Sequence, residues 1–416
     1  MDGDSGRDGT GEVRPGMDHL AVVALTLLLG GSVIALVGQH TAAQAGPAIV
    51  LSLLLAALGA GLVLCCLQDL VLRLPSAEGL HGLLATSWGT RVAGLLGAVL
   101  LLELVMTMAG AAQSAASHLH AALATADIQL GFWLPVQVTA AAGLLALGAV
   151  ALLPPRRVAL VACGLLTIKI GVGVLLLTLA ARHVHYAHWI PWLPPATAPY
   201  RFGLGGVLAA AVPLLGVFAS VGLALGFPAL RRQRAMWQPA VLGLVSLLAM
   251  LLLMVLLMVL AALQAGLVEF PALASPRPLS VALQMHPQLQ WMLPLLPLAG
   301  AAGLVALQLV LLVLAVPLAR GLWPAAWCPV RWSWTVAVVL PAVLLVLWSP
   351  LDALPALPGP ATLLVMAALC LAVPRQRRQE SGQGTSRRDV VMSLLAPMAA
   401  ALCLLAGAQR LWGTSG

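Results

Sequence analysis

Long apolar runs alternate with short polar or proline-containing segments along most of the chain. A helix needs about 20 apolar residues to cross a bilayer, and about eleven runs approach or exceed that length. They lie at residues 19–38, 47–72, 91–117, 133–153, 158–181, 204–229, 239–266, 291–319, 333–349, 359–374 and 390–408. The pattern predicts an all-α polytopic membrane protein with about eleven transmembrane helices.

Two of these spans carry helix-weakening residues near their middle. The residues are Gly30, Gly31 and Ser32 in the first span, and Pro213, Gly216, Ser220 and Gly222 in the sixth. A membrane helix tolerates such a break where the freed backbone groups line a cavity. Interruptions at matching positions predict a five-plus-five inverted repeat, with broken helices 1 and 6 and a binding site between them. The alternative is that the glycines serve only close helix packing.

The composition agrees with a membrane protein. Of 416 residues, 61% are hydrophobic and 8% are charged, whereas soluble domains contain about 25% charged residues. The net charge of +8 does not indicate nucleic acid, because the arginines sit in short loops between spans. With the N-terminus inside, the predicted outer segments hold only Arg182, Arg201, Arg277 and Arg410. The positive-inside rule therefore predicts a cytoplasmic N-terminus, with the lipid bilayer as partner.

Four regions follow from the span pattern. Residues 1–17 form a polar cytoplasmic tail, and 18–374 form a core of ten spans. Residues 375–389 form a basic cytoplasmic linker, and 390–416 contain the final transmembrane helix. The alanine- and leucine-rich, lysine-poor composition is typical of a high-GC bacterial genome, which places the chain in a bacterial inner membrane.

Two ionisable residues lie deep inside predicted spans, Glu103 in the third and Lys169 in the fifth. A charge at the bilayer centre costs at least about 2.5–3.5 kcal/mol, so each needs a reason. Lys169 is a candidate for exchanging a proton or for taking the place of a cation, and Glu103 for coupling. The alternative for both is a structural ion pair or hydrogen bond that ties helices together. Asp69 lies at the inner end of the second span, and this position favours a gating or structural role for it.

Other candidate chemistry is sparse. His183, His185 and His188 could ligate a metal, but no carboxylate or cysteine is near them and the segment also suits a membrane interface. No nucleotide-binding loop, zinc-protease motif or nucleophile elbow occurs in the chain. The sequence predicts no metal site, no cofactor and no enzyme.

Several short motifs occur in an order and spacing that match one transporter family. They are Gly30-Gly31-Ser32-Val33-Ile34, Gly46-Pro47-Ala48, Cys66 with Asp69, Arg73, Pro75 and Ala77, Leu102-Glu103 with Val105, Ile168-Lys169-Ile170, Trp189 with Pro191, Leu193 and Pro194, Gly206-Val207, and Gln233-Arg234. Through these motifs, residues 20 to 375 resemble the amino acid–polyamine–organocation (APC) superfamily, closest to its cationic amino acid transporter branch.

The resemblance implies an amino acid permease: a secondary transporter that moves amino acids or related amines by alternating access, with proton coupling. It implies that backbone N–H groups of Gly30, Gly31, Ser32 and Val33 bind the substrate carboxylate. Phe218 and Ser220 would shape the span-six side of the site. Lys169 would occupy the sodium position of related transporters and take part in proton coupling.

The chain also departs from the family pattern. Ser32 replaces the third glycine of the break, Ile34 replaces a phenylalanine gate, and Gly222 stands where the cationic branch tends to have an acidic residue. These departures keep open a degenerate, non-transporting membrane scaffold or sensor of the same fold. A third alternative is a membrane enzyme or metal-handling protein that uses the His183–His188 segment.

Overall fold

The computed structural model describes residues 23, 26–27, 33–74, 77, 79–125, 128, 134–196, 201–226, 239–275, 277–323, 330–351, 354–355, 359–380 and 387–413. Throughout this described part the regular elements are helices, and no strand occurs. The all-α fold class is therefore confirmed.

The α-helices are α2 (Val33–His40), α3 (Ile49–Arg73), α4 (Gly79–Trp88), α5 (Thr90–Ala124), α7 (Val136–Ala151), α8 (Pro155–Ala180), α9 (Gly203–Ala219), α11 (Pro239–Leu267), α12 (Pro278–Gln284), α13 (Leu295–Leu322), α14 (Arg331–Trp348), α15 (Pro360–Glu380) and α16 (Arg387–Gly413). Shorter π or 3-10 segments are η1 (Thr41–Ala45), η2 (Gly46–Ala48), η3 (Ala181–His183), η4 (Tyr186–Trp189), η5 (Ser220–Gly226), η6 (Phe270–Leu273) and η7 (Pro287–Met292).

Seven helical segments in the described part are long and apolar enough to cross a membrane. Residues 33–73 count as one of them, and α7 and the apolar part of α14 are shorter apolar helices. Large hydrophobic side chains face outward, such as Leu95 at 68% exposure and Leu252 at 68%. An outer surface of this kind needs lipid around it. The chain is a polytopic integral membrane protein.

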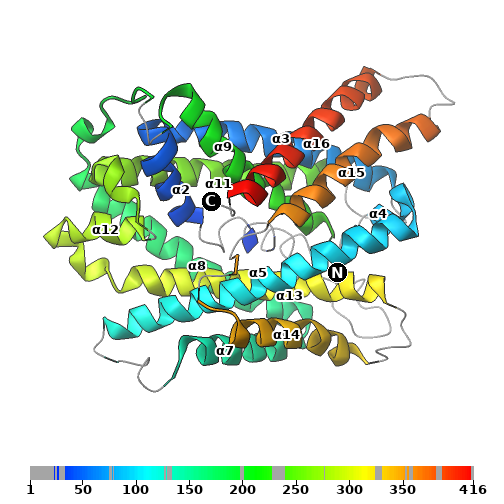
Figure 1. Cartoon of the computed structure of the whole chain (residues 1–416), viewed down its shortest axis with the longest axis horizontal. Helices are drawn as coiled ribbons and strands as arrows, with labels where there is room; N and C mark the ends of the chain where they lie inside the picture. The colour runs from blue at the N-terminus through cyan, green and yellow to red at the C-terminus, as the bar shows by residue number, and fades with distance from the viewer. Residues whose placement is uncertain are drawn as a thin grey trace, which may run out of the picture.

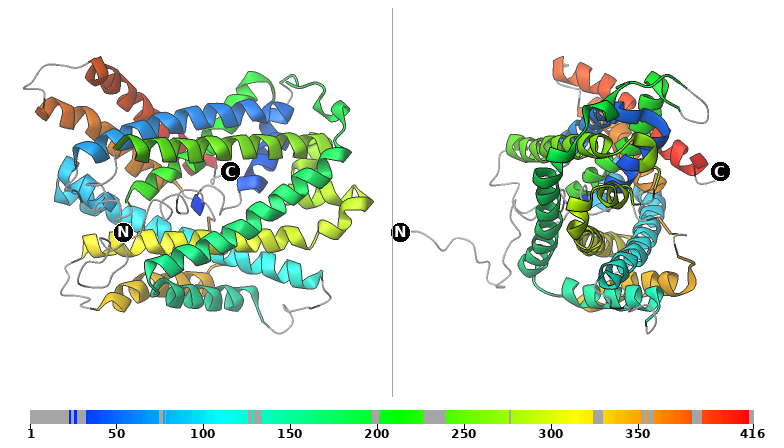
Figure 2. Two further views of the ribbon diagram at one scale, coloured as in Figure 1. Left: turned by 180° about the vertical axis from the view of Figure 1, so that it is seen from behind. Right: turned by 90° about the vertical axis from the view of Figure 1, so that its left-hand side faces the viewer.

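The long helices α3, α5, α11 and α13 run side by side roughly along the long axis of the molecule, and α8 crosses them obliquely (Figure 1 and Figure 2). The short helix α12 lies at one end of this bundle, and α4 lies at the other. The end-on view in Figure 2 shows the helices grouped around a common core, with α7 and α14 together at one edge. Helix α13 packs along both α5 and α8, so these three helices lie together.

The expected interruption of span six is visible as a change of helix type. Helix α9 ends at Ala219, and the chain continues as the 3-10 segment η5 from Ser220. Pro213 lies inside α9, where it removes one backbone hydrogen-bond donor. The matching break in span one, residues 28–32, lies outside the described residues.

Segment 354–355 packs closely against α5 because Gly110 has no side chain. A Cβ atom at Gly110 would collide with the backbone of Pro355. Helix α15 begins shortly afterwards, at Pro360, and its first turn meets Glu103 of α5. Figure 1 shows the N-terminal end of α15 near the middle of the molecule, so this predicted span begins well inside the bundle.

Candidate functional site

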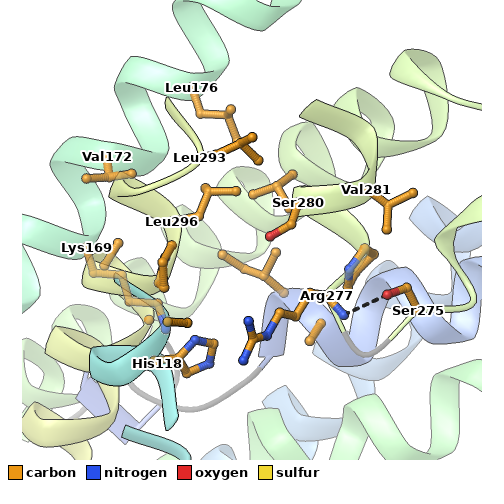
Figure 3. Close-up of a pocket in the computed structure, with 18 of the residues that line it drawn as sticks. His118, Lys169, Val172, Leu176, Ser275, Arg277, Ser280, Val281, Leu293 and Leu296 are labelled. Carbon is orange, nitrogen blue, oxygen red and sulfur yellow. Dashed lines mark hydrogen bonds between the residues drawn. The ribbon is translucent and has the colours of Figure 1, made fainter. Parts of the chain in front are cut away.

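A cavity of about 940 Å³ lies among α2, α5, α8, α12 and α13. Figure 3 shows side chains from several of these elements converging on it. Ser275, Arg277, much of α12 and residues around the start of α13 line one side, so the cavity lies toward the end of the molecule that carries α12. This is the outer end in the predicted orientation.

Lys169 of α8 is part of the cavity wall. Val172, Gly173 and Leu176 line the same wall, because residues three, four and seven positions apart share one helix face. The lysine side chain is half-buried, with its surroundings mainly apolar. The structure therefore places Lys169 at a cavity, and its role in coupling stays a prediction.

His118 of α5 and Arg277, which directly precedes α12, also line the cavity. Figure 3 shows the Arg277 guanidinium directed toward the His118 ring, with Lys169 on the other side of that ring. Arg277 and Lys169 are both close enough to His118 to interact with it electrostatically. Neither His118 nor Arg277 is expected at the site from the sequence. Two features of the sequence could have pointed to these residues. Arg277 lies in a predicted outer segment, against the positive-inside rule, and His118 lies near the end of an apolar span.

Neutral polar side chains complete the lining. They are Gln39 of α2, Ser114 and Ser117 of α5, and Thr125, Ser275, Ser280 and Gln284. The other lining residues are apolar or glycine, and none of those that the structure describes is Asp or Glu. Such a wall, apolar with a few convergent polar groups, is typical of a small-molecule site.

The residues expected from spans one and six do not meet at this cavity in the described part of the chain. Gly30, Gly31 and Ser32 lie outside the described residues. Val33 is buried at the start of α2. Phe218 and Ser220 are buried in the core, and Ser220 donates its hydroxyl hydrogen bond to the carbonyl of Val217 at 2.6 Å. Their roles in substrate binding stay predictions.

Glu103 contacts the first turn of α15. Its carboxylate accepts hydrogen bonds from the backbone N–H groups of Ala361, at 2.6 Å, and Thr362, at 2.9 Å. It also accepts one from the Thr362 hydroxyl. A carboxylate at a helix N-terminus satisfies otherwise unpaired donors and interacts favourably with the helix dipole. These contacts favour the structural alternative for Glu103, and its coupling role stays untested.

Asp69 lies at the opposite end of the bundle from the cavity and pairs with two arginines. Its Oδ1 is 2.7 Å from Nη2 of Arg377 on α15, and its Oδ2 is 3.0 Å from Nε of Arg73 on α3. Asp69 and Arg377 are both about 6% exposed at their side chains. The pair therefore joins α3 and α15 at the predicted inner end, which suits either a gating or a structural role.

Ring contacts join His183 to His286 and His185 to His188, and two of these histidines also bind backbone carbonyls. Nδ1 of His188 is 2.9 Å from the Gly266 carbonyl, and Nε2 of His286 is 3.0 Å from the Leu267 carbonyl. These carbonyls end α11, so the two rings cap that helix. Within the described ranges, no group of three or more His, Cys, Asp or Glu side chains is arranged to hold a metal ion.

The apolar bundle and its cavity define a polytopic helical membrane protein, and the comparisons with known proteins identify its architecture. No family model matches the chain. The methylthioribose transporter of Bacillus subtilis (strain 168) is 24% identical over 218 residues, which cover 49% of this chain and 44% of that transporter. The match therefore spans less than half of that relative's length.

Solved structures of the manganese transporter of Eremococcus coleocola match over nearly the whole chain. A mutant form gives a TM-score of 0.58 at 16% identity and covers 96% of this chain and 87% of the other. The complex with an aromatic bis-isothiourea substituted compound gives a TM-score of 0.53 at 17% identity, covering 99% and 92%. The chain shares the fold of these polytopic transporters. The similar proteins are transporters and not enzymes, as the sequence leads us to expect.

Proposed function

We propose that the protein is a secondary transporter of small solutes, with amino acids or related amines as substrates. It works by alternating access across a bacterial inner membrane, with its N-terminus in the cytoplasm. The cavity around Lys169 is the observation that carries this proposal. A half-buried lysine beside a solute-sized space is costly unless the protein uses it.

The two ends of the bundle support an outward-open state. The cavity lies at the α12 end, whereas the Asp69–Arg377 pair joins α3 and α15 at the other end. Alternating access requires one end to close while the other opens. In this proposal the ion pair closes the inner end while solute enters from outside.

The span-one residues Gly30, Gly31, Ser32 and Val33 offer backbone N–H groups to a substrate carboxylate. Phe218 and Ser220 shape the span-six side of the substrate site, and Lys169 couples proton movement to substrate movement. This assignment rests on the APC resemblance of the first, fifth and sixth spans. Exposed N–H groups at a helix break are well suited to bind a carboxylate.

The similar proteins suggest two further substrates for the test. Methylthioribose is a small polar solute, and the cavity lining combines apolar walls with polar side chains. Manganese is less well supported, because it prefers carboxylate, carbonyl and water oxygens. The lining residues that the structure describes include no Asp or Glu.

The experiment is uptake into proteoliposomes of a labelled panel: neutral, acidic and basic amino acids, polyamines, methylthioribose and Mn²⁺. Each is measured with and without an inward-acid proton gradient. We expect saturable uptake of one class, raised by the gradient. No uptake of any substrate by well-folded protein would refute the proposal and favour the non-transporting scaffold.

The coupling role of Lys169 is tested in the same assay. Lys169→Ala should reduce gradient-driven uptake to the background level, because the side chain that takes up the proton is gone. Thr167→Ala is the matched control, since Thr167 lies on the same helix, is exposed, and donates its hydroxyl hydrogen bond to the Cys163 carbonyl within that helix. Unchanged gradient dependence in Lys169→Ala would contradict this role.

A further inference from the structure

The charges that line the cavity are all positive. Arg277 and protonated Lys169 each carry a positive charge, and the described lining has no acidic residue. Like charges that face one space repel each other, and they do so more strongly between apolar walls than in water. An anion bound between them would remove this repulsion.

His118 provides a second, independent indication of a ligand. Its Nδ1 is buried and has no hydrogen-bond partner among the residues that the structure describes. Buried polar atoms almost always have a partner, so the His118 ring leaves a hydrogen-bonding requirement unmet at the cavity wall. The ring packs on α13 at Gly300, where an added Cβ would lie 3.2 Å from Nδ1 and Cε1. Helix α13 therefore fixes the position of the imidazole.

We infer that the cavity binds a small organic anion, which has a second carboxylate besides the one assigned to the span-one break, and that this second carboxylate is held among Lys169, His118 and Arg277. The inference rests on the proposed function, because it names the substrate class of the same site. Two positive charges, Arg277 and protonated Lys169, match a solute with net negative charge, such as an acidic amino acid or a dicarboxylate. The same charges oppose a polyamine or any solute whose only charge is an amine.

The arrangement also links the anion to the proton. When Lys169 is protonated, it adds positive charge beside the cavity and strengthens anion binding. By linkage, a bound anion strengthens the binding of that proton to the same degree. The two therefore bind together, as proton–anion symport requires.

Binding to the purified full-length chain in detergent tests the inference without requiring transport. The probes are glutamate, succinate, inorganic phosphate and putrescine, with affinity measured by calorimetry. Glutamate and succinate should bind, and putrescine should not. Affinity for both carboxylates should fall as sodium chloride is raised, because salt screens charge at an open cavity.

Variants of Arg277 sharpen the test, because this residue is exposed and outside the core. Arg277→Gln should weaken glutamate binding roughly ten- to hundredfold, the range expected for losing a hydrogen bond to a charged group. Arg277→Glu should abolish glutamate binding and permit putrescine binding. Arg182→Gln is the matched control: Arg182 is also an exposed outer arginine but does not line the cavity, so affinity should not change.

Three results would overturn the inference: putrescine binding more tightly than glutamate to the unaltered chain, phosphate binding more tightly than either carboxylate, or unchanged glutamate affinity in Arg277→Gln. The outcome is separable from that of the proposed function. Glutamate binding without any uptake would refute transport alone. Uptake of putrescine that glutamate does not inhibit would refute the anion site alone.

Discussion

Glu103 illustrates how a buried charge acquires its partners in this fold. The carboxylate lies in α5, but the donors that satisfy it come from the first turn of α15, more than 250 positions later. Two backbone N–H groups and one hydroxyl converge on it. A carboxylate with several charge-assisted hydrogen bonds is more strongly held than a neutral group in the same place.

Glu103→Gln should therefore lower thermal stability. A glutamine has one acceptor oxygen and turns an NH₂ group toward the donors of Ala361 and Thr362. The loss should be about 1–3 kcal/mol, seen as a fall of a few degrees in the melting temperature of the purified protein. Thr362→Val, which removes only the hydroxyl donor, should cause a smaller fall.

The same variant separates the two roles considered for Glu103. With a helix-capping role, Glu103→Gln lowers the melting temperature, and the remaining uptake keeps its dependence on the proton gradient. An unchanged melting temperature together with lost gradient dependence would establish the coupling role instead.

At the scale of elements, the sequence predicts most helices but few of the contacts between them. Lys169 could be identified as a candidate because one charge stands out in an apolar span. His118 and Arg277 could not, because their proximity depends on how the 267–290 segment folds over α5 and α8. Helix α4 also escapes prediction from the sequence, since it is short and lies between two spans.

Helix α4 carries a further titratable group, His81, outside the membrane-spanning segments. Its ring packs over two glycines, Gly97 of α5 and Gly321 of α13. Burial lowers the pKa of His81 below its ordinary value of 6.5. His81 therefore binds a proton less tightly in the folded protein than in the unfolded chain.

The sign of the pH dependence follows from that difference. The contribution of neutral His81 to the free energy of unfolding is complete above pH 6.5. It is lost progressively as the pH falls below 6.5 toward the lowered pKa. The melting temperature should therefore fall more steeply with acidification in the unaltered protein than in His81→Gln. Other histidines titrate in both proteins, so the difference between the two curves is the measured quantity. Parallel curves would show that His81 does not contribute.

At the scale of the whole molecule, the two ends differ in what closes them. Polar and charged side chains surround open space at the α12 end, whereas a buried ion pair holds α3 to α15 at the α4 end. Figure 1 shows these ends opposite each other along the long helices. The sequence identifies Asp69 as a gating or structural candidate and predicts the order of the helices. It does not predict that Arg377 is the ion-pair partner of Asp69.

Breaking this pair should open the inner end. Asp69→Asn leaves Arg377 buried without its carboxylate, which typically costs about 3–5 kcal/mol.

Cys66, one turn before Asp69 on α3, and Cys370 on α15 are both buried. In a variant that keeps Cys66 as its only cysteine, Asp69→Asn should raise the rate of labelling by a membrane-impermeant maleimide from the inner side. Arg378→Gln, at an exposed neighbour of Arg377, is the control and should leave the rate unchanged. If Asp69→Asn lowers stability without changing the labelling of Cys66, the ion pair is structural and the inner gate lies elsewhere.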